Sequence, residues 1–377
     1  MPCHQMRLPS QFLATVFTVI ALFAGGVGAF AQDTSAEQIV LKRCWNYTDE
    51  KVFSVLTVDG TNAFVSTNEA QIAAVSLESG QKLWSADLGG TLVSNLEATP
   101  AGLFLVTQPA AVEGKRSSAL MWRMSKETGI PSKPIELGEG NYTLRSIGSR
   151  LILVSTSGTI SLYDSAEMKA AWSRIPTGSI VGEPFISNDL IAVATGDGKL
   201  IKMSVDSGEI ISTQQLESKP TSVHASRDGV VFGNERGQLT SVDPDWKFRA
   251  GASINGVRTI GDSLLVSSFD NFIYLLTRSG GVVWKKRLEG RIAGSVAIDE
   301  QRIAAFSLGG ENGYVIDIKR GRAVGVVPLG SPADSLVVGP QNGLGPVLLM
   351  NGSLTAFSKN GCKINGGAVV TTPPNSK

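Results

Sequence analysis

Few residues of this 377-residue sequence have the types and spacing that catalysis or metal binding requires. His224 is the only histidine after His4, and a single histidine removes most histidine-based metal sites and the usual Ser-His-Asp arrangement. The acidic segments at residues 195–198 (TGDG) and 242–245 (VDPD) lack the spacing of a calcium loop and are interpreted as turns. The sequence therefore predicts no catalytic residue and no metal site.

Two cysteines could form a covalent bond. Cys44 and Cys362 lie near opposite ends of the chain, and the third cysteine, Cys3, precedes an apolar segment. Two thiols in an oxidising compartment are most often joined, so we predict a Cys44–Cys362 disulfide, with two free thiols as the alternative.

The N-terminal residues 1–31 have the order of charge and hydrophobicity that is typical of a secretory signal peptide. Arg7 precedes an apolar stretch over residues 12–23, and small residues then lead to an A-x-A sequence at residues 29–31. A membrane anchor is the alternative, but the apolar stretch is short and glycines dilute its end. No lipobox cysteine follows it. We therefore expect an exported protein, either periplasmic or secreted.

The exported chain would keep 33 acidic residues and lose one of 34 basic residues, so its net charge would be near zero. A nucleic-acid partner or an anionic membrane surface requires a basic surplus, which is missing. No second apolar stretch is long enough to span a bilayer. We expect no nucleic-acid partner and no transmembrane segment in the mature chain.

The elements that must position these residues follow a repeat. Eight short β-branched segments recur about every 40 residues, and each is followed by turn residues and a second apolar strand. They begin at Ala63, Leu103, Leu151, Leu190, Val230, Leu264, Ile303 and Val347. Four antiparallel strands per repeat of this length form a propeller blade. We predict an all-β fold, an eight-bladed β-propeller over residues 40–365, with a short linker at 32–39 and a disordered tail at 366–377.

Four tryptophans have equivalent places on the predicted outer strands. They are Trp45, Trp84, Trp172 and Trp284. Trp84, for example, follows Gly80 by four residues. A ring at such a place can pack across the gap between blades and bury roughly 150–250 Å². Because each blade needs a neighbour to cover its faces, we predict that these tryptophans dock adjacent blades, with ligand stacking as the alternative.

Residues 73–84 (AAVSLESGQKLW) and 274–284 (YLLTRSGGVVW) resemble the tryptophan-docking repeat of PQQ-like β-propellers. Other repeats depart from the pattern, since Ser212 and Gly325 stand where the tryptophan is expected. In length and blade number the chain is similar to the BamB family of outer-membrane assembly factors. That resemblance implies a non-catalytic, monomeric interaction scaffold without a cofactor. Its partners would be envelope proteins, among them the outer-membrane β-barrel insertase.

Counting the strands of the eighth repeat indicates how the ring closes, because the chain ends before a fourth strand. Residues 40–48 have the character of an outer strand and would complete the eighth blade as its fourth strand, which removes an exposed edge. This closure would place Cys44 beside the turn that contains Cys362.

Two alternative functions remain. A PQQ-dependent dehydrogenase of this repeat type would bind PQQ beside an adjacent Cys-Cys pair, which is missing here. A propeller that binds a small ligand or a polysaccharide would use its loops. The long insertion at residues 108–122 in blade 2 is the best candidate partner loop, through Glu113, Lys115 and Arg116.

Overall fold

A computed structural model describes residues 38–111, 117–176, 178–218, 220, 222–226, 229–242, 245–339 and 345–359. The predicted signal peptide and the predicted tail lie outside these ranges. So do Glu113, Lys115, Arg116 and Cys362.

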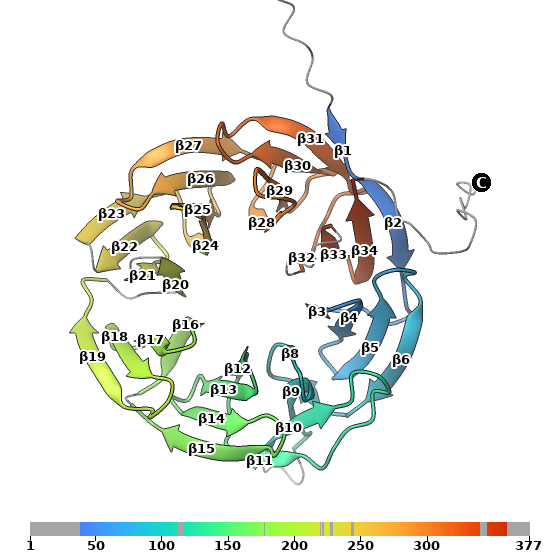
Figure 1. The fold of residues 1–377 in the computed structure, drawn as a ribbon, viewed down its shortest axis with the longest axis vertical. Coiled ribbons are helices and arrows are strands. Elements are labelled where there is room, and N and C mark those ends of the chain that lie inside the picture. The colour runs from blue at the N-terminus through green and yellow to red at the C-terminus, as the bar shows by residue number, and fades with distance from the viewer. Residues whose placement is uncertain are drawn as a thin grey trace, which may run out of the picture. The chain divides into compact units, whose positions relative to one another are not determined.

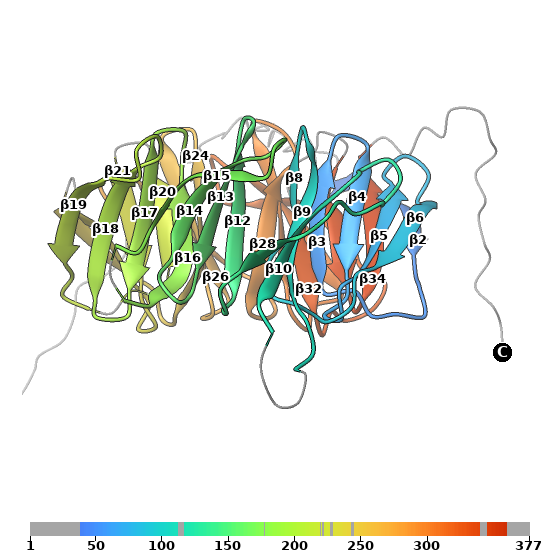
Figure 2. The ribbon, with the colours of Figure 1, turned by 90° about the horizontal axis from the view of Figure 1, so that it is seen from below.

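The described strands form eight sheets that follow one another around a ring (Figure 1). Within each sheet the strands run between the two faces of the ring, as the side view shows (Figure 2). Apart from two N-terminal strands, each sheet is built from antiparallel neighbours in sequence order, from an inner strand at the centre to an outer strand at the rim. The prediction of an eight-bladed, all-β propeller is therefore confirmed.

The first four blades use consecutive strands. Blade 1 contains β3 (Val55–Asp59), β4 (Asn62–Ser66), β5 (Gln71–Ser76) and β6 (Lys82–Asp87). Blade 2 contains β7 (Thr91–Leu92), β8 (Glu97–Thr99), β9 (Gly102–Gln108), β10 (Ala119–Met124) and β11 (Ile135–Leu137). Blade 3 contains β12 (Tyr142–Ile147), β13 (Arg150–Ser155), β14 (Ile160–Asp164) and β15 (Lys169–Arg174). Blade 4 contains β16 (Ile180–Ile186), β17 (Leu190–Thr195), β18 (Lys199–Ser204) and β19 (Ile210–Gln215).

The next three blades repeat this arrangement. Blade 5 contains β20 (Ser222–Ser226), β21 (Gly229–Gly233), β22 (Gln238–Val242) and β23 (Asp245–Arg249). Blade 6 contains β24 (Ile254–Ile260), β25 (Ser263–Ser268), β26 (Phe272–Thr277) and β27 (Val282–Arg287). Blade 7 contains β28 (Ile292–Ala297), β29 (Arg302–Ser307), β30 (Asn312–Asp317) and β31 (Ala323–Pro328).

Blade 8 joins the two ends of the ring. It contains β32 (Leu336–Val338), β33 (Val347–Met350), β34 (Ser353–Ser358) and, as its outer strand, β2 (Lys42–Tyr47). Because β2 pairs antiparallel with β34, the predicted closure by an N-terminal strand is confirmed.

A short strand precedes β2 and adds to a different blade. β1 (Ile39–Val40) pairs in parallel with β31 of blade 7, and the Leu41 N–H donates to the Val326 carbonyl at 3.0 Å. A Cβ at Gly325 would lie 1.9 Å from the Ile39 carbonyl oxygen, so only glycine leaves room for this strand. Ile39, which the sequence places in the linker, is thus part of a sheet.

The hydrophobic core consists of layers between blades. One such layer joins Phe64 and Ile72 of blade 1 to Leu103 and Leu105 of blade 2, all of them buried. Since neighbouring blades cover both faces of a middle strand, that strand needs apolar residues at consecutive positions, and the first six residues of β9 are all buried. This arrangement explains why the chain shows short apolar runs rather than strict alternation.

Candidate functional site

The tryptophans of the outer strands bind the next blade around the ring. The Trp84 Nε1 of β6 donates a hydrogen bond to the Lys126 carbonyl of blade 2 at 2.8 Å. Equivalent bonds run from Trp45 to the Leu77 carbonyl (2.8 Å), from Trp172 to Val205 (3.0 Å) and from Trp284 to Ile318 (2.7 Å). Each indole therefore satisfies a backbone carbonyl across a blade boundary.

A glycine of the next blade accommodates each ring. A Cβ at Gly129 would lie 2.4 Å from the Trp84 ring, and the φ of +71° is in the region that favours glycine. The other such pairs are Trp45 with Gly80, Trp172 with Gly208 and Trp284 with Gly321. Gly80 thus receives Trp45 of the preceding blade, while Trp84 of its own repeat reaches forward. We call such a pair a Trp–Gly dock.

Trp246 of β23 makes a fifth dock that the sequence analysis missed. Its ring packs on Gly280 of blade 6, where a Cβ would come within 2.4 Å of it. The turn before Trp246 contains no glycine, so the repeat pattern within blade 5 is broken. Gly280 of the following repeat was the sequence signal that could have identified this dock.

Three boundaries between blades have no Trp–Gly dock among the described residues. At the boundary of blades 2 and 3, strand β11 of blade 2 contains no tryptophan. In blade 3, Met168 replaces the glycine that would receive such a ring, and it has the same left-handed conformation, with a φ of 55°. In β19 of blade 4 the register places Ser212 at the docking position, and in β31 it places Gly325 there. The boundaries of blades 2–3, 4–5 and 7–8 therefore rely on other contacts.

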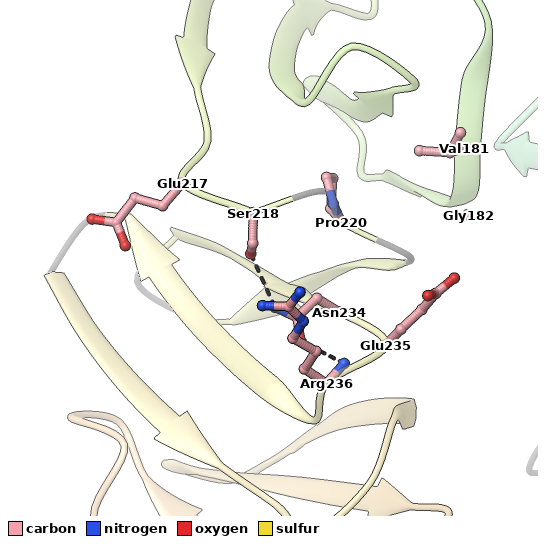
Figure 3. Close-up of a pocket in the computed structure, with 8 residues that line it drawn as sticks. All are labelled: Val181, Gly182, Glu217, Ser218, Pro220, Asn234, Glu235 and Arg236. Carbon is pink, nitrogen blue, oxygen red and sulfur yellow. Dashed lines mark hydrogen bonds between the residues drawn. The ribbon is translucent and has the colours of Figure 1, made fainter.

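A cleft opens at the boundary of blades 4 and 5, where the dock is missing (Figure 3). Its volume is about 510 Å³. It is lined by Val181, Gly182, Glu217, Ser218, Pro220, Asn234, Glu235 and Arg236. We call it the seam cleft. Figure 3 shows Glu217 and Glu235 on opposite sides of it, with Ser218 and Asn234 between them.

The turn from β21 to β22 builds one wall of the seam cleft. The buried Asn234 side chain accepts hydrogen bonds from the backbone N–H of Arg236 and of Gln238, both at 3.0 Å, and donates to the Ser218 hydroxyl at 2.9 Å. These bonds hold Glu235 and Arg236 at the exposed tip of the turn. The asparagine thus fixes an anion and a cation side by side at the cleft.

A bulge in β16 builds the opposite wall. The register with β17 shifts between Val181 and Phe185, which leaves three residues of β16 opposite one of β17. Gly182 in this bulge has a φ of +70°, a conformation that suits glycine. The bulge thus places Val181 and Gly182 of the inner strand of blade 4 along the seam cleft.

A second cleft of about 300 Å³ shares Glu217 and Ser218 with the seam cleft and extends along the outer part of the same boundary. Lys247 of β23 lies there, and its Nζ is 2.6 Å from a Glu217 carboxylate oxygen. The hydrogen bond to Glu217 raises the pKa of Lys247. The Ser241 hydroxyl lines this cleft and has no hydrogen-bond partner among the described residues.

The predicted partner loop in blade 2 borders another cleft, of about 530 Å³, at the undocked boundary of blades 2 and 3. Pro109, Ala110 and Ala111 line it together with Glu139 and Asn141. The charged residues predicted for this loop lie outside the described residues, so their role stays a prediction. Trp122 of β10 donates a hydrogen bond to the Thr107 hydroxyl at 3.0 Å, within blade 2.

His224 on the inner strand of blade 5 is largely buried, and its Nε2 has no hydrogen-bond partner among the described residues. Burial lowers the pKa of His224 to about 4. The unfolded chain binds a proton near the ordinary pKa of 6.5, so between these two values the unfolded state holds more protons. Stability should therefore fall as the pH falls from about 6.5 to about 4.

We expect this histidine to reduce the free energy of unfolding by on the order of 3 kcal/mol over that range, at about 1.4 kcal/mol per pH unit. Urea denaturation of the wild type and of His224→Gln at several pH values measures the effect. Carboxylates contribute equally to both proteins. The difference between the two proteins in the slope of the free energy of unfolding against pH therefore isolates the contribution of His224. Parallel slopes would show that His224 titrates normally in the fold.

No group of three or more His, Cys, Asp or Glu side chains in the described ranges has the geometry to hold a metal ion. The described part of the chain also lacks any helix with the length and hydropathy needed to cross a membrane. Cys44 is disulfide-bonded. Its predicted partner Cys362 lies outside the described residues, so the pairing stays a prediction.

Comparison with known proteins points to one kind of propeller. A family model described as the outer membrane protein assembly factor BamB matches residues 110–246. The outer membrane protein assembly factor BamB of Shewanella oneidensis is 21% identical over 252 residues, which cover 60% of this chain and 61% of that protein. The match thus spans about three-fifths of that relative.

Solved structures extend the likeness of the fold. The crystal structure of BamB from Moraxella catarrhalis matches with a TM-score of 0.64 and 13% identity, over 84% of this chain and 97% of that one. The computationally designed protein Ika8 matches with a TM-score of 0.67 and 12% identity, over 85% and 99%. A designed ring shares the architecture, so the fold by itself does not decide the function. The predicted resemblance is confirmed: in its repeat and its fold the chain is similar to PQQ-like β-propellers of the BamB type.

Proposed function

We propose that this protein is an exported, non-catalytic scaffold that binds other envelope proteins during outer-membrane protein assembly. One observation carries the proposal: every residue that lines the seam cleft lies within the span that matches the BamB family model. The relatives are named for outer-membrane protein assembly, which suggests the same process here. The outer-membrane β-barrel insertase is the proposed partner.

The chemistry of the seam cleft favours binding over catalysis. Glu217 is engaged by Lys247, and Asn234 is engaged by the backbone of its own turn. Glu235 and Arg236 are exposed at the rim, with opposite charges that suit complementary groups on a protein surface. The cleft thus offers charges that orient a partner, and its described lining residues include no nucleophile beside a base.

We further propose that the protein works without PQQ or another cofactor. Titration with PQQ, followed by its absorbance and by reduction of an artificial electron acceptor, tests this directly. Saturable PQQ binding with turnover of an alcohol or an aldose would contradict the scaffold function and show that the protein is a PQQ-dependent dehydrogenase.

Reversing both charges at the cleft rim should abolish partner binding. We expect Glu235→Lys with Arg236→Glu to reduce recovery of the cross-linked envelope partner by at least about tenfold, because like charges then face the partner. The measurement is cross-linking in the native envelope, pull-down and identification of the captured proteins.

The matched control combines Glu167→Lys in the turn from β14 to β15 with Lys169→Glu at the first residue of β15, at the opposite ends of the blade strands. It also reverses two exposed charges and should leave recovery unchanged. Equal recovery with both double variants would contradict a role of the seam cleft. If the wild type captures no envelope protein, the scaffold function itself is wrong.

A further inference from the structure

Two clusters of basic residues lie on the outer rim of the ring, where β27 of blade 6 and β31 of blade 7 are neighbours (Figure 1). The six residues are Lys285, Lys286 and Arg287 at the end of β27, and Lys319, Arg320 and Arg322 in the turn from β30 to β31. All are exposed except Lys286, which is half-buried. We call these six residues the basic rim.

A Trp–Gly dock joins the two clusters. The Trp284 Nε1 donates to the Ile318 carbonyl at 2.7 Å, and the Trp284 ring packs on Gly321. Lys285 directly follows Trp284 on β27, and the cations of the turn flank the two residues that this tryptophan contacts. Cations from two distant parts of the sequence therefore share one surface.

Ion pairs within the described chain do not neutralise the basic rim. None of its six cations forms an ion pair with a described residue, and Lys285 instead lies 5.3 Å from the centroid of the Phe272 ring. Elsewhere a cation can be paired across a blade boundary, as Lys126 of blade 2 is with Asp59 of blade 1 at 2.7 Å. Because like charges repel one another, an anionic partner would relieve a repulsion that the chain itself leaves in place.

Exposed apolar side chains border these cations. Val282 and Val283 precede Trp284 on β27 and are 51% and 49% exposed. Burial of such side chains stabilises a complex, whereas the surrounding charges select the partner and orient it. The surface complementary to the basic rim therefore carries apolar groups among acidic ones.

The carboxylates around the basic rim favour a narrow partner over a broad anionic surface. Glu300 and Glu311 are exposed in the turns at opposite ends of β29, and Glu289 is exposed in the loop after β27. An anionic membrane is much wider than the rim and would bring its charges close to these carboxylates as well, within the screening length of about 8 Å. A protein segment contacts the rim alone and avoids that repulsion.

We propose that the basic rim binds an acidic segment of another protein, in which Asp or Glu residues are interspersed with apolar ones. The guanidinium groups of Arg320 and Arg322 can each bind a carboxylate through two hydrogen bonds, and the apolar residues of the segment would cover Val282 and Val283. The basic rim belongs to other blades than the seam cleft, so this inference goes beyond the proposed function and does not depend on it.

The test uses the full-length protein and a fluorescein-labelled peptide of about twelve residues in which Glu and Val alternate. We expect fluorescence anisotropy to show saturable binding at about 0.1 M NaCl and its loss at about 1 M NaCl, where the screening length is only about 3 Å. A peptide with Gln in place of every Glu keeps the length and the apolar residues but lacks the charge, so it should not bind.

Charge reversal in either cluster should weaken peptide binding by at least about tenfold, because attractive contacts become repulsive. One variant combines Lys319→Glu, Arg320→Glu and Arg322→Glu, and a second combines Lys285→Glu and Arg287→Glu. Loss of binding in both variants would show that the two clusters form one site.

Blades 2 and 3 provide the matched control. It combines Lys133→Glu, Lys169→Glu and Arg174→Glu, which reverse three exposed basic residues and change the total charge as the first variant does. This control should leave peptide binding unchanged, while thermal melting shows that all three variants fold. Equal losses in the rim and control variants, or no binding by the wild type, would overturn the proposal.

Two other occupants of the basic rim have their own readouts. If the wild type sediments with phosphatidylglycerol vesicles, the rim variants do not, and the peptide fails to bind, the rim binds lipid and the proposal is wrong. A wild-type dimer that the rim variants dissociate would assign the rim to a second copy of this chain and also overturn the proposal.

Failure of this proposal is distinguishable from failure of the scaffold function. If the peptide binds the basic rim but no envelope partner cross-links, the rim is an acidic-segment site and the scaffold function is wrong. If the envelope partner cross-links and the wild type does not bind the peptide, the scaffold function stands and the rim proposal is wrong.

Discussion

Trp84→Ala should lower the free energy of unfolding by about 3–5 kcal/mol, because it empties a layer between blades and leaves the Lys126 carbonyl without its partner. The Trp84 ring packs on Gly129 and lies 5.9 Å from the Phe64 ring, centroid to centroid. Urea denaturation followed by circular dichroism measures the loss. A matched control is Leu83→Ala on the same strand, which removes a half-exposed side chain and should cost less than about 0.5 kcal/mol.

The opposite half of the dock provides an independent variant. Gly129→Ala inserts a methyl group that would lie 2.4 Å from the Trp84 ring, at a left-handed φ. We expect it to destabilise the protein by about 1–3 kcal/mol, and to cost far less in a Trp84→Ala background. Additive losses in the double variant would contradict contact between the two residues as the source of the stability.

Loss of the predicted terminal disulfide should have an effect of similar size. Cys44 is the bulged residue of β2, between Arg43 and Trp45, so a bond to Cys362 would lock the strand that closes the ring. The bond would close a loop of more than 300 residues, for which the chain-entropy model gives roughly 5–6 kcal/mol. We expect Cys362→Ser to lower the free energy of unfolding by about 2–5 kcal/mol, since real bonds seldom reach the model value.

The reducing agent serves as the control for this second prediction. Dithiothreitol should destabilise the wild type by the same amount as Cys362→Ser and should leave the variant unchanged. Mass spectrometry of the non-reduced peptides identifies the pair directly. A peptide that joins Cys44 to Cys3, or a variant as stable as the wild type, would show that the predicted pairing is wrong.

The seam cleft illustrates what a sequence pattern misses. Its walls are the bulge at Gly182 and the turn at Asn234, which belong to strands of two different blades. No spacing within one repeat contains that information.

The Trp–Gly docks also show the difference between what a sequence repeat indicates and which residues are in contact in the structure. The sequence linked Trp84 to Gly80, four residues earlier, because both recur together in one repeat. The contact is instead between Trp84 and Gly129 of the next blade, and Gly80 serves Trp45. Periodicity shows that two residues are used together, but not which copies of them meet.

The sequence by itself determined the all-β propeller, its eight blades and the closure by residues 40–48. These features depend on hydrophobic period, turn residues and repeat length, all of which are local properties of the chain. Which tryptophan meets which glycine, and where the clefts open, became known only from the tertiary structure. Those features arise where residues from separate blades meet, because the geometry of a boundary depends on both of its sides.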